Sequence, residues 1–156
     1  MSEMSEVLTM PLPTRRSTTE LARRLAGQLA SADLVLLGGP LGAGKTFLVR
    51  ALCRGLGLPA RVRVTSPTFS LVHEYATTPP VVHADVYRLD SGRDVLGLGL
   101  RDQRDEGRLV LVEWGEPYLE LLGGDALIVR LSLDPRQAEL LSTGPRSEEI
   151  LCGLRG

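Results

Sequence analysis

Gly39-Pro40-Leu41-Gly42-Ala43-Gly44-Lys45-Thr46 is the stretch of this 156-residue chain that decides its fold, because it matches the phosphate-binding loop pattern G-x-x-x-x-G-K-[ST] in full. A backbone that wraps closely around a phosphate adopts dihedral angles that a Cβ would block, and it must bring its N–H groups to the anion. Gly39, Gly42 and Gly44 meet that need. The stretch therefore predicts a nucleotide-binding loop.

Lys45 and Thr46 carry the polar chemistry of this loop. The ammonium group of the lysine is expected to reach the β- and γ-phosphate oxygens, and the threonine hydroxyl to ligate Mg²⁺. Lys45 is also the only lysine in the chain, since the other 17 of the 18 basic residues are arginine. A compact point charge suits a phosphate cradle better than a planar guanidinium does.

The segments on either side of the loop have the right pattern. Residues 33–38 indicate a short buried strand, and the apolar spacing from Phe47 to Leu56 indicates a helix that ends near Gly57. This helix is expected to point its N-terminal dipole at the phosphates. The residues that we expect to surround the nucleotide are Gly39, Leu41, Gly42, Ala43, Gly44, Lys45, Thr46 and Phe47. Trp114, the only tryptophan, could stack on a base or fill the core.

The composition is that of an ordinary globular protein, with 43% hydrophobic residues, 24% charged residues and a net charge of −1. No apolar run approaches the length of a membrane span, and the first residues lack the pattern of a signal peptide, so we expect a cytoplasmic protein without membrane contact. Near-neutral charge argues against tight direct binding of nucleic acid. The length predicts one domain over residues 1–156, with its core at about 15–134 and a peripheral tail over 135–156.

Periodicity predicts an α/β fold. A capping box at residues 17–20 suggests a helix that runs to about Ala32, and residues 61–65 alternate like a short strand. The runs 70–76 and 81–89, joined by a proline-rich turn, suggest an antiparallel pair. Residues 109–113 are apolar up to a final glutamate, as in a strand at the centre of a parallel sheet.

Two carboxylates follow predicted strands and complete the set that nucleotide hydrolysis requires. Asp85 and Glu113 are expected at the same edge of the sheet, where one would support Mg²⁺ and the other would act on the attacking water. The pattern favours Asp85 for the metal and Glu113 for the water, although a surface ion pair would also explain Asp85. Ser66 and Thr68 lie in a loop that could sense the γ-phosphate, or that could be a plain proline turn.

Taken together, these motifs resemble the TsaE (YjeE) family of P-loop ATPases, which act in bacterial threonylcarbamoyladenosine modification of tRNA. The resemblance covers about residues 35–120 and rests on the conjunction of several motifs at the family's approximate spacing. They are Leu41-Gly42-Ala43-Gly44-Lys45-Thr46, Ser66-Pro67-Thr68-Phe69, Glu74-Tyr75, His83-x-Asp85-x-Tyr87-Arg88-Leu89, Leu98-Gly99-Leu100 and Glu113-Trp114.

The resemblance implies a three-layer P-loop NTPase fold, with a mostly parallel central sheet flanked by antiparallel strands. It implies ATP and Mg²⁺ as ligands, with catalytic roles for Lys45, Asp85 and Glu113, metal contacts from Thr46, Asp85 and Glu113, and Trp114 near the nucleotide. It further implies that hydrolysis supports a complex of TsaD and TsaB homologues, which performs the transfer and holds the tRNA. The chain departs from the family pattern at Pro40, Phe47 and Gly115.

Two other functions remain open from the residues. A small P-loop kinase would use an arginine-rich lid, and residues 90–108 carry Arg93, Arg101, Arg104 and Arg108. A nucleotide-gated binding module would bind ATP to fix a docking surface without hydrolysing it. Phosphate transfer to a small acceptor would favour the kinase, and a Glu113→Gln variant that keeps its partner function would favour the binding module.

Overall fold

A computed structural model of the chain describes residues 7–67 and 71–156, and the strands that it assigns form one seven-stranded sheet in the order β1-β7-β6-β2-β5-β4-β3. The parallel strands are β2 (Leu34–Gly38), β4 (Val81–Asp85), β5 (Leu109–Glu113) and β6 (Ala126–Leu133). Antiparallel strands flank them, namely β3 (Val72–Tyr75) at one edge and β7 (Arg136–Ser142) and β1 (Leu8–Pro11) at the other. This is the predicted mostly parallel sheet with antiparallel flanks.

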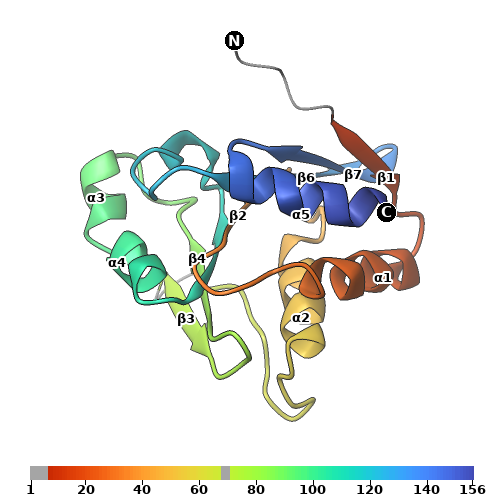
Figure 1. Cartoon of the computed structure of the whole chain (residues 1–156), viewed down its shortest axis with the longest axis horizontal. Helices are drawn as coiled ribbons and strands as arrows, with labels where there is room; N and C mark the ends of the chain where they lie inside the picture. The colour runs from red at the N-terminus through yellow and green to blue at the C-terminus, as the bar shows by residue number, and fades with distance from the viewer. Residues whose placement is uncertain (1–6, 68–70) are drawn as a thin grey trace.

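Helices cover both faces of this sheet and give the molecule three layers. Helices α1 (Arg15–Ala26) and α2 (Lys45–Gly55) lie together on one side of the molecule, and α3 (Gly92–Leu96) and α4 (Leu100–Asp105) lie on the other, as Figure 1 shows. Two buried apolar clusters correspond to these two faces. Alternate residues of each central strand point into one cluster or the other, as expected for strands that are buried on both sides.

Two predicted elements differ from the structure. Helix α1 starts earlier than predicted because Thr14 is its N-cap and Ser17 is the third helical residue of the capping box. It also ends earlier, at Ala26, where Gly27 forms the C-cap. Residues 61–65 are not a strand. The carbonyl oxygen of Val62 accepts instead from the Arg54 guanidinium at 2.7 Å, so this loop is held by a side chain rather than by a sheet ladder.

The expected peripheral tail over residues 135–156 is wrong, because β7 lies inside the sheet between β1 and β6. The segment continues into helix α5 (Pro145–Arg155), which buries Ile150, Leu151 and Leu154 in the same cluster as α1 and α2. Polar residues interrupt the apolar pattern of residues 135–156, so the sequence alone does not reveal that this segment is packed. The last strand and helix therefore belong to the packed core.

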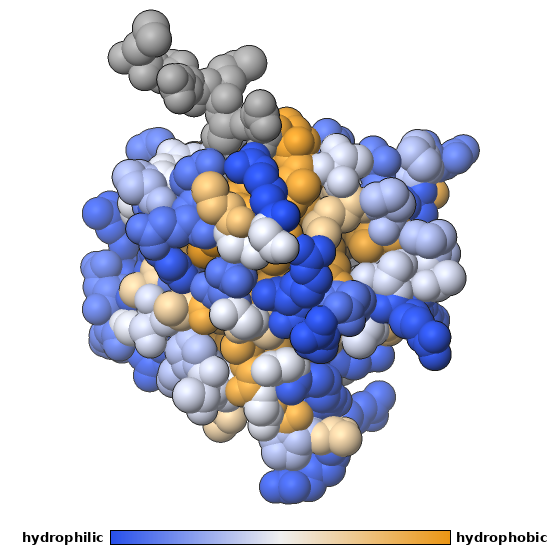
Figure 2. All heavy atoms as spheres, turned by 45° about the vertical axis from the view of Figure 1, so that its right-hand side comes forward, coloured by the Kyte–Doolittle hydropathy of each residue, from blue (hydrophilic) through white to orange (hydrophobic). Residues whose placement is uncertain are grey.

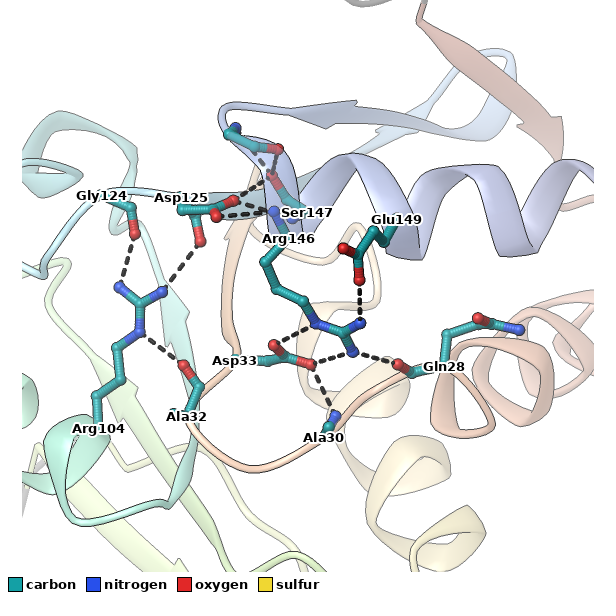
Figure 3. A network of polar contacts seen from close by, with 11 residues as sticks. Gln28, Ala30, Ala32, Asp33, Arg104, Gly124, Asp125, Arg146, Ser147 and Glu149 are labelled. Atoms are coloured by element: carbon teal, nitrogen blue, oxygen red, sulfur yellow. Dashed lines mark hydrogen bonds and ion pairs between the residues drawn. The ribbon is translucent and has the colours of Figure 1, made fainter.

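Charged side chains attach α5 to the amino ends of the parallel strands (Figure 3). Arg146 pairs with both carboxylate oxygens of the buried Asp33 at 2.9 Å, and the pairing raises the pKa of the arginine. Asp125 accepts hydrogen bonds from the backbone amides of Arg146 and Ser147, each at 2.9 Å.

Arg104 makes a second set of bonds in the same region. It donates to the carbonyl oxygens of Ala32, Leu122, Gly124 and Asp125. All of these bonds lie at the end of the sheet opposite the glycine loop.

The outer surface is mixed in character. Hydrophilic side chains cover most of the face in Figure 2, with a narrow apolar band between them. Large apolar side chains that the described residues expose are scattered over several elements; they are Val7, Leu41, Tyr87, Leu96 and Leu133. No helix among residues 7–67 and 71–156 combines the length and the apolar character that crossing a bilayer demands.

Candidate functional site

The glycine loop joins the carboxyl end of β2 to the start of α2, as the sequence predicts. All three of its predicted glycines have positive φ, which L-residues with a Cβ rarely adopt. At Gly39, with φ of 127°, a Cβ would also lie 2.3 Å from the backbone oxygen of Leu131. At Gly42 and Gly44, by contrast, a Cβ would meet no atom within 4 Å. The first glycine is thus required by close packing, whereas the other two border open space.

Helix α2 begins at this loop with an N-terminus that no side chain caps. Its N-cap is Gly44, in the left-handed conformation with φ of 103°. The first-turn amides of a helix have no acceptor within the helix itself, and they carry the positive end of its dipole. Thr46 lies in this first turn and is half-buried. An anion at the loop would meet backbone donors and one hydroxyl.

Lys45 is folded back onto its own loop. Its Nζ donates to the carbonyl oxygens of Gly39 at 2.5 Å and Pro40 at 3.0 Å, and it lies 4.3 Å from the centre of the Trp114 ring. Burial lowers the pKa of the lysine, while the carboxylates of Glu113 and Asp85 act to raise it. The predicted lysine and tryptophan are therefore in contact. The two predicted carboxylates are close enough to act electrostatically on the lysine.

Trp114 reaches the loop because the chain turns sharply after β5. Its φ is 65°, an uncommon value for a bulky residue, and its amide donates to the carbonyl oxygen of Leu37 at 2.9 Å. Its ring also packs against that of Tyr87, with 4.9 Å between the ring centres. A backbone conformation of this kind is retained where the surrounding structure imposes it, often at a functional site.

Asp85 and Glu113 lie side by side at the carboxyl edge of the sheet. They are partners in the register of β4 and β5, so their side chains share the face that α2 covers. Asp85 accepts from the Tyr87 amide at 2.9 Å and from the Ser66 hydroxyl at 3.3 Å. Ser66 therefore contacts the predicted metal-side carboxylate, whereas Thr68 falls outside the described residues.

Glu113 is buried, with 3% of its surface exposed, and its Oε2 lies 2.6 Å from Nε2 of His83. His83 is fully buried. Neither His83 nor His73 has a metal-ligand spacing, and the motif that contains His83 did not by itself predict a role for this histidine. The signal is the strand register, which places the His83 ring one step before Asp85 on the same face of β4 and diagonally opposite Glu113.

Phe47 lies elsewhere, in a hollow of about 160 Å³ beside the loop. Its ring lies 5.6 Å from the guanidinium carbon of Arg15, at the start of α1. Ala43 also lines this hollow, while Leu41 projects from the loop with 68% of its surface exposed. The sequence did not single out Arg15, because no motif includes it. The remaining lining residues are Leu12, Thr18, Gly42, Gly44, Leu131, Ser132, Arg136 and Gln137.

Protein groups alone do not make a metal centre here, since residues 7–67 and 71–156 contain no group of three or more His, Cys, Asp or Glu side chains that could hold an ion. This donor set fits Mg²⁺ bound together with a nucleotide, because Mg²⁺ is usually held by one or two carboxylates plus phosphate oxygens and water. Asp85, Glu113 and the Thr46 hydroxyl are oxygen donors of the required type.

Arg104 and Arg108, two of the four arginines of residues 90–108, lie away from the loop. Arg104 is bonded to carbonyl groups at the amino ends of β2 and β6, and Arg108 pairs with Glu106 at 2.6 Å just before β5 begins. The five residues of β5 separate that end of the sheet from the loop by roughly 16 Å. These two arginines therefore do not form the lid that a kinase would require.

A profile of the family described as "Threonylcarbamoyl adenosine biosynthesis protein TsaE" matches residues 12–140. The chain belongs to the TsaE family. A TsaE protein of Streptomyces coelicolor, described as a tRNA threonylcarbamoyladenosine biosynthesis protein, is 45% identical over 115 residues, which are 72% of this chain and 76% of the relative. A TsaE protein of Rickettsia felis with the same description is 35% identical over 139 residues, or 88% of this chain and 80% of the relative.

The fold of this TsaE member is also similar to a solved structure. The crystal structure of YdiB from Bacillus subtilis superposes with a TM-score of 0.80 at 27% sequence identity, covering 99% of this chain and 97% of the other. The likeness therefore extends to β7 and α5, which both lie beyond the motifs that first indicated TsaE. It supports the P-loop NTPase-like fold and the place of the last strand and helix in it.

Proposed function

We propose that this protein is a Mg²⁺-dependent ATPase whose hydrolysis cycle supports turnover of a TsaD–TsaB complex, which threonylcarbamoylates the tRNA adenosine next to the anticodon. The convergence of Lys45, Asp85 and Glu113 at the glycine loop carries this proposal. Phosphoryl transfer needs a phosphate cradle, a cation, a carboxylate on the metal side and a group that orients the nucleophile. Residues that could supply the cradle, bind the cation and act as the two catalytic groups lie together at one edge of the sheet.

In this proposal each group has a distinct role. Lys45 exchanges the loop carbonyls for β- and γ-phosphate oxygens, and the first-turn amides of α2 bind the same anion. Thr46 and Asp85 hold the metal, and Glu113 orients the attacking water. Mg²⁺, when bound, neutralises the charge of the phosphate oxygens. We assign the water to Glu113 and the metal to Asp85 because Glu113 is the more deeply buried of the two carboxylates.

The hollow beside the loop suits the nucleoside part of ATP. It is bounded by Phe47 and Arg15, and an aromatic ring and a guanidinium both offer flat faces to a base. Gly42, Ala43 and Gly44 of the loop line the hollow, whereas Lys45 does not, so a nucleotide with its base in the hollow would have the loop between its base and Lys45. Trp114 then lies at the phosphate end, next to Lys45, rather than on the base.

The proposal assigns the transfer reaction and most of the tRNA contact to the partner complex. The net charge of −1 supports this, because a protein that binds RNA by itself generally offers an excess of Lys and Arg. The protein does not itself transfer the threonylcarbamoyl group. A tRNA substrate also makes the cytoplasm the expected place of action.

Steady-state ATP hydrolysis with and without Mg²⁺ tests the proposal, first on the protein alone and then with the TsaD–TsaB complex of the same organism. We expect slow turnover that rises with the complex and is lost in Lys45→Ala. Lys45→Arg is the matched variant, because it keeps the charge but not the compact shape, and it should also be inactive. A rate that neither Mg²⁺ nor either variant changes would refute the proposal.

A further inference from the structure

His83 and Glu113 form a buried pair beside the glycine loop. The imidazole is 0% exposed and the carboxylate 3% exposed, and Nε2 and Oε2 are 2.6 Å apart. A carboxylate that is ionised can only accept, so this bond then requires the tautomer in which Nε2 carries the proton and donates it. Among the described residues, His83 is the only hydrogen-bond partner of the Glu113 side chain.

The packing of His83 leaves the other ring nitrogen without a hydrogen bond to any described residue. Nδ1 is buried and has no hydrogen-bond partner within the described part of the chain. On the same face of the sheet its neighbours Val81 and Leu111 are apolar, and an apolar side chain at position 83 would leave no polar atom unsatisfied. A buried polar atom without a partner requires an explanation, and the bond to Glu113 supplies one.

The two oxygens of Glu113 are in different surroundings. Oε2 is bonded to His83, whereas Oε1 makes no hydrogen bond, yet it is absent from the buried unsatisfied atoms of residues 7–67 and 71–156. Oε1 therefore keeps contact with solvent. The pair fixes one oxygen and leaves the other free to accept from water. Asp85, by contrast, is held by Ser66 and the Tyr87 amide and does not depend on His83.

We propose that His83 is a positioning residue that holds Glu113 by the Nε2–H···Oε2 bond, so that Oε1 faces the water that attacks the γ-phosphate. This inference rests on the proposed ATPase function. His83 touches neither nucleotide nor water in this account, and it acts only through the orientation of Glu113. A carboxylate released from this bond would sample several rotamers, and the fraction of time spent in the productive one would fall.

Variants at position 83 test the proposal by separating chemistry from binding. Removal of such a supporting hydrogen bond typically costs about 10- to 100-fold in activity, so His83→Leu should lower kcat by that factor and leave KM for ATP within about twofold. His83→Gln can still offer an N–H to Glu113 and should recover most of the loss. His73→Gln is the matched control, because His73 lies opposite His83 on β3 but bonds to Tyr75 rather than to Glu113.

A second measurement needs neither ATP nor hydrolysis. Long-range ¹H–¹⁵N correlation on the nucleotide-free protein should show His83 with its proton on Nε2, and Glu113→Ala should remove the protection of that proton from exchange. In the Glu113→Gln background, His83→Leu should cause no further loss of kcat, because residues that act through one group are not additive.

The outcomes separate the inference from the function on which it rests. A kcat of His83→Leu within twofold of the wild type, an equal loss in His73→Gln, a loss confined to KM, or a proton on Nδ1 would each overturn the role of His83 while the ATPase stands. A wild-type protein that binds ATP but never hydrolyses it with its partners would overturn the function, and the role of His83 with it.

Discussion

Gly39→Ala is the substitution whose effect the structure predicts most sharply, because two separate penalties act at that position. The residue has φ of 127°, and a Cβ there would lie 2.3 Å from the Leu131 carbonyl oxygen. Gly42→Ala is the matched control. Its φ of 82° is also positive, but no atom lies within 4 Å of the added Cβ. The two variants differ mainly in the contact with β6.

The strain of a left-handed backbone costs an L-residue about 1–2 kcal/mol, and both variants incur it. Relief of the clash at Gly39 requires movement of a backbone atom in a paired strand, since Leu131 is in register with Ala138 of β7. Overpacking of this kind adds about 1–3 kcal/mol. We therefore expect Gly42→Ala to lose about 1 kcal/mol and Gly39→Ala about 3 kcal/mol of unfolding free energy.

Equilibrium urea unfolding, followed by circular dichroism, measures both losses. For a chain of this size the difference corresponds to about 4–8 °C in Tm, well within the resolution of a thermal scan. The result that would refute the reasoning is a pair of variants destabilised equally, within about 0.5 kcal/mol. That outcome would mean that the loop moves away from β6 without cost, and that close packing does not explain the first glycine.

Three further predictions concern regions away from the loop. Arg146→Ala removes the bidentate partner of a buried aspartate and should cost about 2 kcal/mol, less than a fully buried pair because the guanidinium is 37% exposed. Arg23→Ala breaks only an exposed helix pair and should cost far less than Arg146→Ala; equal losses in urea unfolding would contradict this. Burial acts to raise the pKa of Asp125, but hydrogen bonds from the first turn of α5 and a nearby arginine lower it overall. A depressed carboxyl pKa stabilises the fold above the unfolded pKa of about 4 and ceases to do so as the pH falls through the folded value, so Asp125→Asn should flatten the acid limb of the stability curve, and parallel curves would exclude this. Burial raises the pKa of Cys53 to about 12 whereas Cys152 is exposed, so a maleimide at neutral pH should add once to the native chain and twice after unfolding, as read by intact mass; rapid double labelling of the native protein would disprove it.

The sequence predicted those parts of the molecule where local pattern and tertiary structure agree. The glycine loop, β2 and α2 follow from one continuous stretch whose residue types leave few alternatives. The central position of β5 follows from its apolar run, because only a strand buried on both faces tolerates one. The side-by-side placement of Asp85 and Glu113 follows from the rule that parallel strands end at a common edge.

The remainder depends on contacts between distant segments, which no local pattern records. β7 alternates weakly and α5 carries few apolar residues, so both resemble a polar tail until the strands and helices that they contact are known. Residues 61–65 alternate like a strand, yet Arg54 holds this loop by hydrogen bonds to the carbonyl oxygens of Pro59 and Val62. The meeting of His83 with Glu113 and of Arg15 with Phe47 depends on register and helix packing, and each pair lies about 30 positions apart in sequence.

The most direct test of the ATPase account is a multiple-turnover assay of tRNA threonylcarbamoylation by the TsaD–TsaB complex, supplied with ATP and either the wild-type protein or Glu113→Gln. The substitution keeps the shape of the side chain and removes its charge, so nucleotide should still bind. We predict that the variant retains ATP and that modification stops after about one turnover of the complex, whereas the wild-type protein sustains it. Sustained modification with Glu113→Gln at the wild-type rate would contradict a hydrolytic role and would favour a nucleotide-gated binding module.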